Sequence, residues 1–136
     1  MAAEMSSQKE SARKIAEGLT ELFAHQREFQ EKHGFDFWKE SPEKRREMFL
    51  RQLFAAISEL AEAGDEVNKW WKKGCKEPEA LAQKKEEILE EMVDVLHFYM
   101  GALLTIGCDG KDVAEAYLKK LSVNHERQKD ARLGYV

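Results

Sequence analysis

The sequence predicts an all-α protein, and three observations support this fold class. Hydrophobic residues make up 43% and charged residues 35% of the 136, a composition too apolar for a disordered chain. Two prolines and eight glycines are too few turn formers for a fold of many strands. Apolar residues also recur at steps of three and four, the spacing of one helical face. Since a chain of this length can bury a core, we expect a single domain over residues 1–136.

The first expected helix begins at a cap on Ser6 or Ser7 and ends near Gly34. A short aromatic loop, residues 35–38, follows the helix. The apolar residues of this segment share one helical face: Ile15, Leu19, Leu22, Phe23 and Phe29.

The second expected helix begins at Ser41 and Pro42, a cap followed by a first-turn proline. It runs to about Lys73, because cations and the following Gly74 suit a helix C-terminus. Its apolar face consists of Leu50, Leu53, Phe54, Ile57, Leu60, Ala61 and Val67.

A third helix is expected from Pro78 to Gly107, and a fourth from a cap on Asp109 to about Gln128. Residues 129–136 then form a polar C-terminal tail. Four amphipathic helices with short connections predict a helical bundle. Because the third helix is apolar on more than one side, we expect a second subunit to help bury it.

The 22 basic and 26 acidic residues give a net charge of −4 at pH 7. The chain therefore lacks the basic footprint of a protein that binds duplex nucleic acid. Its longest apolar stretch, residues 92–106, is too short to span a bilayer and contains Asp94 and His97. The first residues lack the pattern of a secretory signal, so we expect a cytoplasmic protein in which Cys75 and Cys108 are free thiols.

Acidic residues stand among small and apolar residues in two of the expected helices. Glu59 and Glu62 lie three residues apart, which places their Cβ atoms about 5–6 Å apart on one face. Glu91 and Asp94 have the same spacing. Valine, leucine and phenylalanine surround Asp94, so its carboxylate should not face solvent easily and needs a partner. No Lys or Arg lies one helical turn away, so that partner must come from elsewhere.

The two acidic pairs face each other if the second and third helices pack antiparallel. Four carboxylates around one small space would then demand a divalent cation. Oxygen ligands without cysteine favour Mg²⁺ or Mn²⁺ over zinc.

Two alternatives of another class stay open. Glu-rich helices commonly present a solvated face, so the chain could be a non-catalytic helical scaffold. A di-iron bundle would use Glu-x-x-His pairs on two helices, but here only Asp94 and His97 approach that pattern. We therefore expect His97 to be a core residue or to support the metal ligands.

These motifs resemble the metal-binding signature of the all-α nucleoside triphosphate pyrophosphatases, which include the MazG-like proteins and the dimeric dUTPases. Three further stretches favour the dimeric dUTPases: residues 69–72, residues 89–98, and a C-terminal run that ends in Gly134 and Tyr135. That run places Lys120, Asn124 and Arg127 on one helical face, where a packed helix would be apolar. Together the matches cover most of the chain from the second helix onward.

The resemblance implies a compact dUTPase whose four-helix bundle is completed by oligomerisation, as a homodimer or homotetramer. The implied reaction is Mg²⁺-dependent hydrolysis of a nucleoside triphosphate at the α-β phosphoanhydride bond. The implied substrate is dUTP, which would yield dUMP and pyrophosphate and be cleared from the nucleotide pool. Another nucleotide, such as dCTP or a modified one, is the alternative substrate.

The resemblance also assigns roles to residues. The metal ligands are Glu59, Glu62, Glu91 and Asp94, and Glu59 or Glu62 also acts as the catalytic base. The phosphate or nucleotide contacts are Lys120, Asn124, Arg127, Tyr135, Trp70, Trp71 and Lys72. Both tryptophans suit a core or subunit interface equally well. The base contacts are Gln26, Gln30 and Trp38; because Gln30 replaces an expected asparagine, the preference for uracil is left open.

Overall fold

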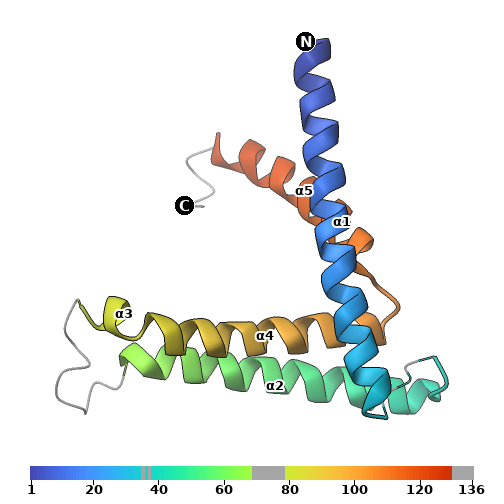
Figure 1. The fold of residues 1–136 in the computed structure, drawn as a ribbon, viewed down its shortest axis with the longest axis vertical. Coiled ribbons are helices and arrows are strands. Elements are labelled where there is room, and N and C mark those ends of the chain that lie inside the picture. The colour runs from blue at the N-terminus through green and yellow to red at the C-terminus, as the bar shows by residue number, and fades with distance from the viewer. Residues whose placement is uncertain (35, 37, 69–78, 130–136) are drawn as a thin grey trace. The chain divides into compact units, whose positions relative to one another are not determined.

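The computed structural model describes residues 1–34, 36, 38–68 and 79–129. These residues form five helices and no strand, which confirms the all-α prediction (Figure 1). The helices are α1 (Ala2–Lys32), α2 (Pro42–Asn68), α3 (Ala80–Gln83), α4 (Lys85–Thr105) and α5 (Gly110–Gln128).

The chain divides into two compact units. One comprises Met1–Glu28 with Cys108–Val136, and the other comprises Phe29–Gly107. The first unit therefore contains most of α1 together with α5, and the second contains the last turn of α1 with α2, α3 and α4. The expectation of a single domain over the whole chain stays a prediction.

Helix α1 is longer at its start than its sequence pattern predicts. It begins at Ala2, so the expected cap at Ser6 or Ser7 is wrong. Alanine and glutamate are strong helix formers, and they extend the helix before the serines. The predicted stop is confirmed: Gly34 has a φ of 91°, in the left-handed region that glycine adopts without strain.

Helix α2 begins as predicted. Pro42 occupies its first turn, and the main-chain N–H of Lys44 donates to the Ser41 hydroxyl at 3.2 Å. The helix extends to Asn68 in the described part of the chain. The expected continuation to Lys73 lies outside the described residues.

The third predicted helix is interrupted, so the expectation of one unbroken helix is wrong. Lys84, with φ −105° and ψ 13°, separates α3 from α4. Neither glycine nor proline marks this break in the sequence. Lys84 Nζ lies 3.8 Å from a Glu66 carboxylate oxygen of α2 and 3.4 Å from one of Glu87. The predicted stop at Gly107 is confirmed, since Gly107 has a φ of 85°.

Helix α5 has the predicted cap. The main-chain N–H of Asp112 donates to Asp109 at 3.0 Å, and the N–H of Asp109 donates to the Asp112 carboxylate at 2.9 Å. This reciprocal capping box fixes the start of α5. The bond from the Asp112 N–H holds the pKa of Asp109 below its ordinary value of 3.8.

Replacement of Asp109 tests this cap. Asp109→Ala should lower the free energy of unfolding by about 1 kcal/mol, because an N-terminal N–H of α5 loses its acceptor. Since the folded-state pKa is lowered, the ionic part of this stabilisation is present above pH 3.8 and is lost as pH falls through the lowered pKa. Asp109→Asn keeps an acceptor without titrating and serves as the control. Thermal denaturation between pH 2.5 and 6 measures both effects, and equal stability of the alanine variant would contradict them.

Helices α2 and α4 lie side by side and run antiparallel (Figure 1). Arg45 near the start of α2 contacts Thr105 at the end of α4, while Glu66 near the end of α2 contacts Lys84 just before α4. The small core of this hairpin includes Met48, Ala63, Met100, Ala102 and Leu104.

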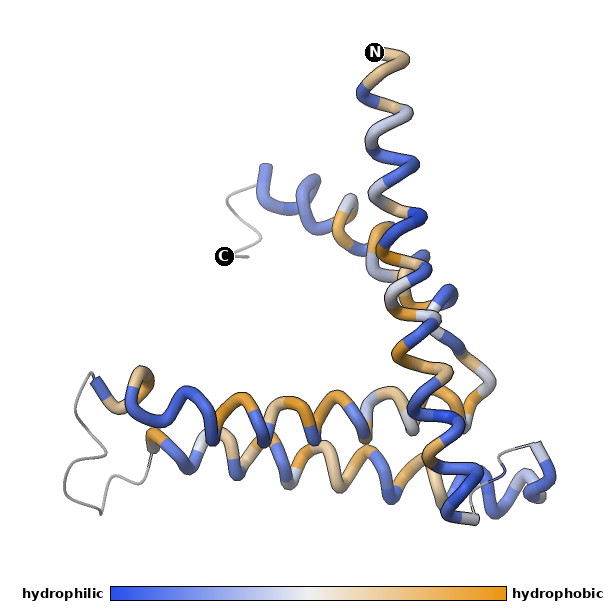
Figure 2. The backbone as a smooth tube through the Cα atoms, in the orientation of Figure 1, coloured by the Kyte–Doolittle hydropathy of each residue, from blue (hydrophilic) through white to orange (hydrophobic). Residues whose placement is uncertain are grey.

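Both helices of the hairpin also leave large apolar side chains exposed. Figure 2 shows that hydrophobic residues recur along both helices. On α2 these are Leu53, Phe54, Ile57 and Leu60, and on α4 they are Leu89, Met92, Val93, Leu96 and Tyr99. Contiguous apolar residues that are exposed in a single chain commonly mark a surface that contacts another molecule or subunit.

No single helix among the described residues is both long and apolar enough to cross a membrane. Of these helices, only α4 and α5 taken together have the length and the apolar composition of a membrane span.

Candidate active site

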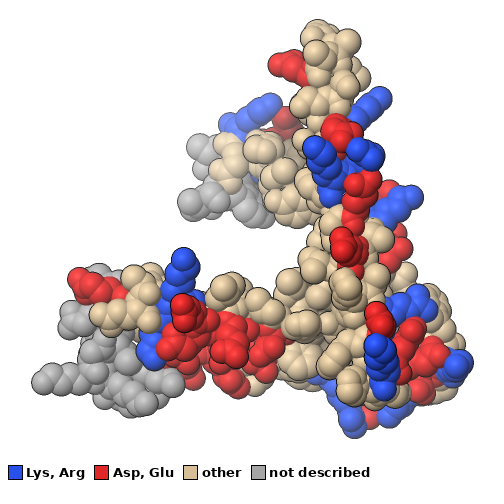
Figure 3. Space-filling view, in the orientation of Figure 1, with Lys and Arg blue, Asp and Glu red and all other residues tan. Residues whose placement is uncertain are grey.

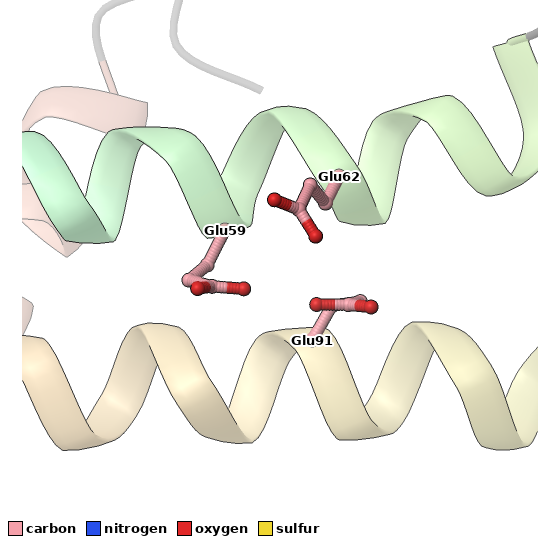
Figure 4. Close-up of side chains that lie close together, drawn as sticks. All are labelled: Glu59, Glu62 and Glu91. Atoms are coloured by element: carbon pink, nitrogen blue, oxygen red, sulfur yellow. The ribbon is translucent and has the colours of Figure 1, made fainter.

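Three carboxylates converge between α2 and α4. Glu59 and Glu62 project from α2 and Glu91 projects from α4, and their side chains point toward one another (Figure 4). One oxygen atom of each lies within 4.8 Å of an oxygen atom of the other two. The predicted antiparallel packing of α2 and α4 therefore brings Glu59 and Glu62 against Glu91, the first member of the second acidic pair.

The local sequence explains this placement. Glu59 and Glu62 are one turn apart on α2, so both carboxylates lie on the same side of the helix. Small residues border them, since Ala55, Ala56 and Ala63 lie within the preceding and following turns. The alanines allow the two helices to approach closely enough for carboxylates on opposite helices to meet.

The electrostatics of the cluster are unfavourable in the absence of a cation. The pKa of Glu91 is raised above its ordinary value of 4.5, first by a hydrogen bond shared with Glu59, then by desolvation and by the negative charges of Glu62, Glu59 and Asp94. In the described part of the chain, no Lys or Arg forms an ion pair with Glu59, Glu62 or Glu91. The carboxylates thus repel one another.

The donor set fits a hard divalent cation. It offers carboxylate oxygens from three residues, two of them half-buried, and within the described residues no Cys or His joins them. Mg²⁺ and Mn²⁺ prefer such oxygen ligands, and a cation would remove the repulsion that raises the pKa of Glu91. The same composition does not match a di-iron site, which needs histidine ligands.

Asp94 lies beside this cluster and not within it. Its charge contributes to the raised pKa of Glu91, but it is not one of the three residues whose oxygens converge. Its side chain is exposed in the single chain, so the expectation that the Asp94 carboxylate should not face solvent easily is wrong. Its apolar neighbours Val93 and Leu96 are exposed as well, because they lie on surfaces that α2 does not cover. His97 is also exposed, which excludes the expected core position.

Acidic side chains gather on one half of the hairpin. In Figure 3, Asp and Glu cover the part of α2 and α4 nearer to α3. The exposed members on α4 are Glu86, Glu87, Glu90 and Asp94. This half of the hairpin therefore surrounds the three converging carboxylates with further negative charge, which attracts cations.

The repulsion around Glu91 predicts a pH dependence of the metal-free protein. A carboxyl group whose folded-state pKa is raised destabilises the fold as pH rises above its ordinary value of 4.5, because the unfolded chain ionises more easily. The melting temperature of the wild type should therefore fall, relative to that of Glu91→Gln, as pH rises from 4 to 7. Thermal scans in the presence of a chelator measure this difference, and Mg²⁺ should reverse it at pH 7. A difference that stays constant with pH would contradict the prediction.

The remaining predicted residues belong to other helices or to segments outside the described residues. Lys120, Asn124 and Arg127 lie on α5, with Lys120 and Asn124 exposed and Arg127 half-buried. Gln26 is buried on α1, 6% exposed, and Gln30 follows one turn later. The nucleotide contacts predicted at Trp70, Trp71, Lys72 and Tyr135 lie outside the described residues.

Trp38 and Gln30 contact the same end of the hairpin. The guanidinium of Arg45 lies 5.5 Å from the centre of the Trp38 ring and donates to the Thr105 carbonyl at 2.9 and 3.2 Å. Gln30 Nε2 donates to Gln52 Oε1 at 3.1 Å. Trp38 remains 55% exposed, so one part of its surface is available to a ligand.

Sequence reasoning missed the polar residues that join these groups. Gln52 Nε2 donates to Thr105 Oγ1 at 2.9 Å, across 53 residues of sequence. The signal that could have found them is Gly101, because a glycine inside an apolar helix lowers helix stability and commonly has a packing reason.

A comparison with known protein families matches the dUTPase family over residues 18–111. The chain belongs to the dUTPase family. No curated protein and no solved structure matches in the corresponding searches. The matched residues include Glu59, Glu62 and Glu91, whose carboxylates converge in the structure.

The chain therefore belongs to a family of hydrolases that act on nucleotides. The match also contains Asp94 and the three residues expected to contact the base, Gln26, Gln30 and Trp38. The phosphate contacts expected on α5, by contrast, lie beyond residue 111. Their roles stay predictions.

Proposed function

We propose that this chain is a Mg²⁺-dependent pyrophosphohydrolase that converts dUTP to dUMP and pyrophosphate. The observation that supports this most strongly is the convergence of Glu59, Glu62 and Glu91 from two antiparallel helices in a member of the dUTPase family. Such an enzyme would clear dUTP from the nucleotide pool. Mn²⁺ could replace Mg²⁺, since both take oxygen ligands.

The acidic residues have two tasks in this proposal. Glu59, Glu62 and Glu91 bind the cation together with the neighbouring Asp94. A bound divalent cation supplies charge neutralisation of the phosphates and lowers the pKa of a water molecule. Glu59 or Glu62 orients that water and accepts its proton. The water oxygen then bonds to the α-phosphorus while the bond from this phosphorus to its bridging oxygen breaks, and pyrophosphate leaves with the electron pair.

Basic and polar groups complete the proposed substrate contacts. Lys120 and Arg127 neutralise phosphate oxygens, the first as a point charge and the second as a two-pronged donor. Asn124, Tyr135 and Lys72 add hydrogen bonds, and Trp70 or Trp71 stacks on the nucleotide or covers it. Gln26, Gln30 and Trp38 contact the base. These assignments rest on the resemblance to dimeric dUTPases and on the residue chemistry.

We also propose that the active protein is a homodimer or homotetramer. The exposed apolar residues on α2 and α4 support this, because a single chain leaves Phe54 68% and Ile57 59% exposed. A second copy of the hairpin would cover these stripes and complete a four-helix bundle.

Hydrolysis in ¹⁸O-labelled water tests the proposed reaction. The purified protein should release pyrophosphate from dUTP only when Mg²⁺ or Mn²⁺ is added, and the label should appear in dUMP, because water attacks the α-phosphorus. Label in the pyrophosphate or phosphate product would contradict the proposed bond. A matched panel with dCTP, dTTP and dATP identifies the preferred base, and a strong preference for dCTP would replace dUTP as substrate.

A further inference from the structure

A chain of hydrogen bonds links α1, α2 and α4 within the unit of residues 29–107. Thr105 Oγ1 donates to the Gly101 carbonyl at 2.8 Å and accepts from Gln52 Nε2 at 2.9 Å. Gln52 Nε2 also donates to the Met48 carbonyl at 3.3 Å. Gln52 Oε1 accepts from Gln30 Nε2 at 3.1 Å. Thr105 is only 2% exposed, and Gln30 and Gln52 are half-buried. We call this chain of hydrogen bonds through Gln30, Gln52, Thr105 and Gly101 the relay.

The main chain fixes the direction of the relay. The carbonyls of Met48 and Gly101 can only accept hydrogen bonds, so the Gln52 atom that faces Met48 must be its amide nitrogen. The oxygen of Gln52 therefore faces Gln30, and the atom of Gln30 that meets it must be a nitrogen. Reversal of the Gln52 amide would break its bonds to the Met48 carbonyl and Thr105 Oγ1, and reversal of the Gln30 amide would place its oxygen against the Gln52 oxygen.

The relay leaves one acceptor without a partner. Gln30 Oε1 is buried and has no hydrogen-bond partner, the single such side-chain atom within the described part of the chain. Buried polar atoms in native proteins are nearly always paired, so an unpaired one needs a physical explanation. A ligand that donates an N–H to this oxygen would supply the missing partner.

Gly101 makes room for the two amides. A Cβ atom at this position would overlap the amide oxygen of Gln52 and come within 2.8 Å of Gln30 Nε2. The side-chain amides therefore pass directly over the backbone of α4. Any larger residue at this position would displace both, even though alanine is otherwise favoured over glycine inside a helix.

The relay lies on the same helix face as the acidic cluster. Gln52 and Glu59 are seven residues apart on α2, which corresponds to about 10 Å along the axis and nearly the same side of the helix. A nucleotide whose base meets the Gln30 oxygen would therefore extend along α2 with its phosphates toward the carboxylates.

We propose that Gln52, Thr105 and the bare backbone at Gly101 are positioning residues that lock the Gln30 amide, so that its oxygen accepts a hydrogen bond from the imide N3–H of a uracil-type base. This inference rests on the proposed function. A glutamine amide that can rotate presents either its oxygen or its nitrogen to the base and so accepts either uracil or cytosine. A locked amide presents only its oxygen and so matches only a base that donates a hydrogen bond at that position. Uracil and thymine carry a hydrogen on N3, while cytosine presents a lone pair there, so the locked oxygen favours the first two and repels the third.

Binding of nucleoside monophosphates tests the inference without relying on turnover. The wild type should bind dUMP at least about tenfold more tightly than dCMP or N3-methyl-dUMP, since neither of these donates from N3. Gln30→Met, which removes the oxygen at similar length, should bring the three affinities close together. Thr105→Val and Gly101→Ala, which disturb the relay and leave Gln30 in place, should both lower the dUMP preference several-fold. Thr105→Ser keeps the hydroxyl and should retain the wild-type preference.

Isothermal titration gives the affinities, and circular dichroism checks that each variant stays helical. A purely structural role of Thr105 would change stability and leave the ratio of affinities unchanged in Thr105→Val. Equal binding of dUMP and N3-methyl-dUMP by the wild type would overturn the inference, as would an unchanged ratio in both Thr105→Val and Gly101→Ala. A wild type that shows the preference but releases no pyrophosphate from dUTP would overturn the proposed function alone.

Discussion

Replacement of Glu91 by glutamine is expected to lower the Mg²⁺-dependent rate of dUTP hydrolysis by at least about 10²-fold, the scale on which single charge-stabilising groups act in active sites. Glu91 is the residue that α4 contributes to the three-carboxylate cluster. Without its charge, Glu59 and Glu62 of α2 cannot hold a cation against the opposite helix. The same change should raise the melting temperature of the metal-free protein at pH 7, because it removes like-charge repulsion.

The opposite signs of these two effects make the prediction specific. Glu90→Gln is the matched control, since Glu90 is an exposed glutamate on the same turn of α4 and is not part of the cluster. That variant should keep nearly full activity. Initial rates of pyrophosphate release and thermal scans with a chelator give both quantities. Full activity in Glu91→Gln, or a loss of equal size in Glu90→Gln, would contradict the role of the cluster.

A charge placed on the apolar stripe of α2 is expected to separate the subunits. Ile57 is 59% exposed in the single chain and lies between Phe54 and Leu60 on the same helix. If a second copy covers it, Ile57→Lys buries an ammonium group without a partner and should weaken self-association by at least about 100-fold. Activity should fall with it, because the bundle that holds the two helices together is lost.

Ser58→Lys introduces the same charge one residue away and serves as the control, because Ser58 is exposed but not apolar. Sedimentation equilibrium at several protein concentrations measures the mass of each variant. The wild type and Ser58→Lys should sediment as the same oligomer, and Ile57→Lys as a monomer. A monomeric wild type, or an Ile57→Lys variant of unchanged mass, would contradict the proposed assembly.

Local signals predicted most of the helix boundaries. Four boundaries could be predicted because each depends on backbone chemistry within a few residues. They are the start of α2 at Ser41 and Pro42, the cap at Asp109, and the stops at Gly34 and Gly107. The start of α1 could not be predicted in this way, because residues of high helix propensity precede the serines and extend the helix beyond the expected cap. The break at Lys84 could not be predicted either, since no glycine or proline accompanies it.

The acidic half of the candidate site was predictable for a similar reason. A three-residue spacing on each helix, together with antiparallel packing, is enough to bring Glu59, Glu62 and Glu91 together. The exposure of Asp94 was not predictable from its neighbours, because apolar residues around it are themselves uncovered in one chain. Its surroundings depend on which helix or subunit packs against α4. The spacing of residues within one helix does not give that information.

The relay behind Gln30 was the least predictable part. Its members come from three helices, and Gln52 and Thr105 pair across 53 residues of sequence. Glutamine and threonine have no characteristic spacing at such a distance. The departure from asparagine at Gln30 was visible in the sequence, but its meaning depends on the longer side chain reaching Gln52 over Gly101.

We propose that the carboxylates of Glu59, Glu62 and Glu91 hold the divalent cation on which the hydrolysis of dUTP depends. Titration with Mn²⁺ followed by electron paramagnetic resonance tests it most directly, because only free aqueous Mn²⁺ gives the strong six-line signal. At pH 7.5 the wild type should remove Mn²⁺ from solution in the presence of dUMP, and excess Mg²⁺ should release it. Glu91→Gln should take up little Mn²⁺, while Glu90→Gln should behave as the wild type does. Equal uptake by Glu91→Gln and the wild type, or no uptake by either, would contradict the claim.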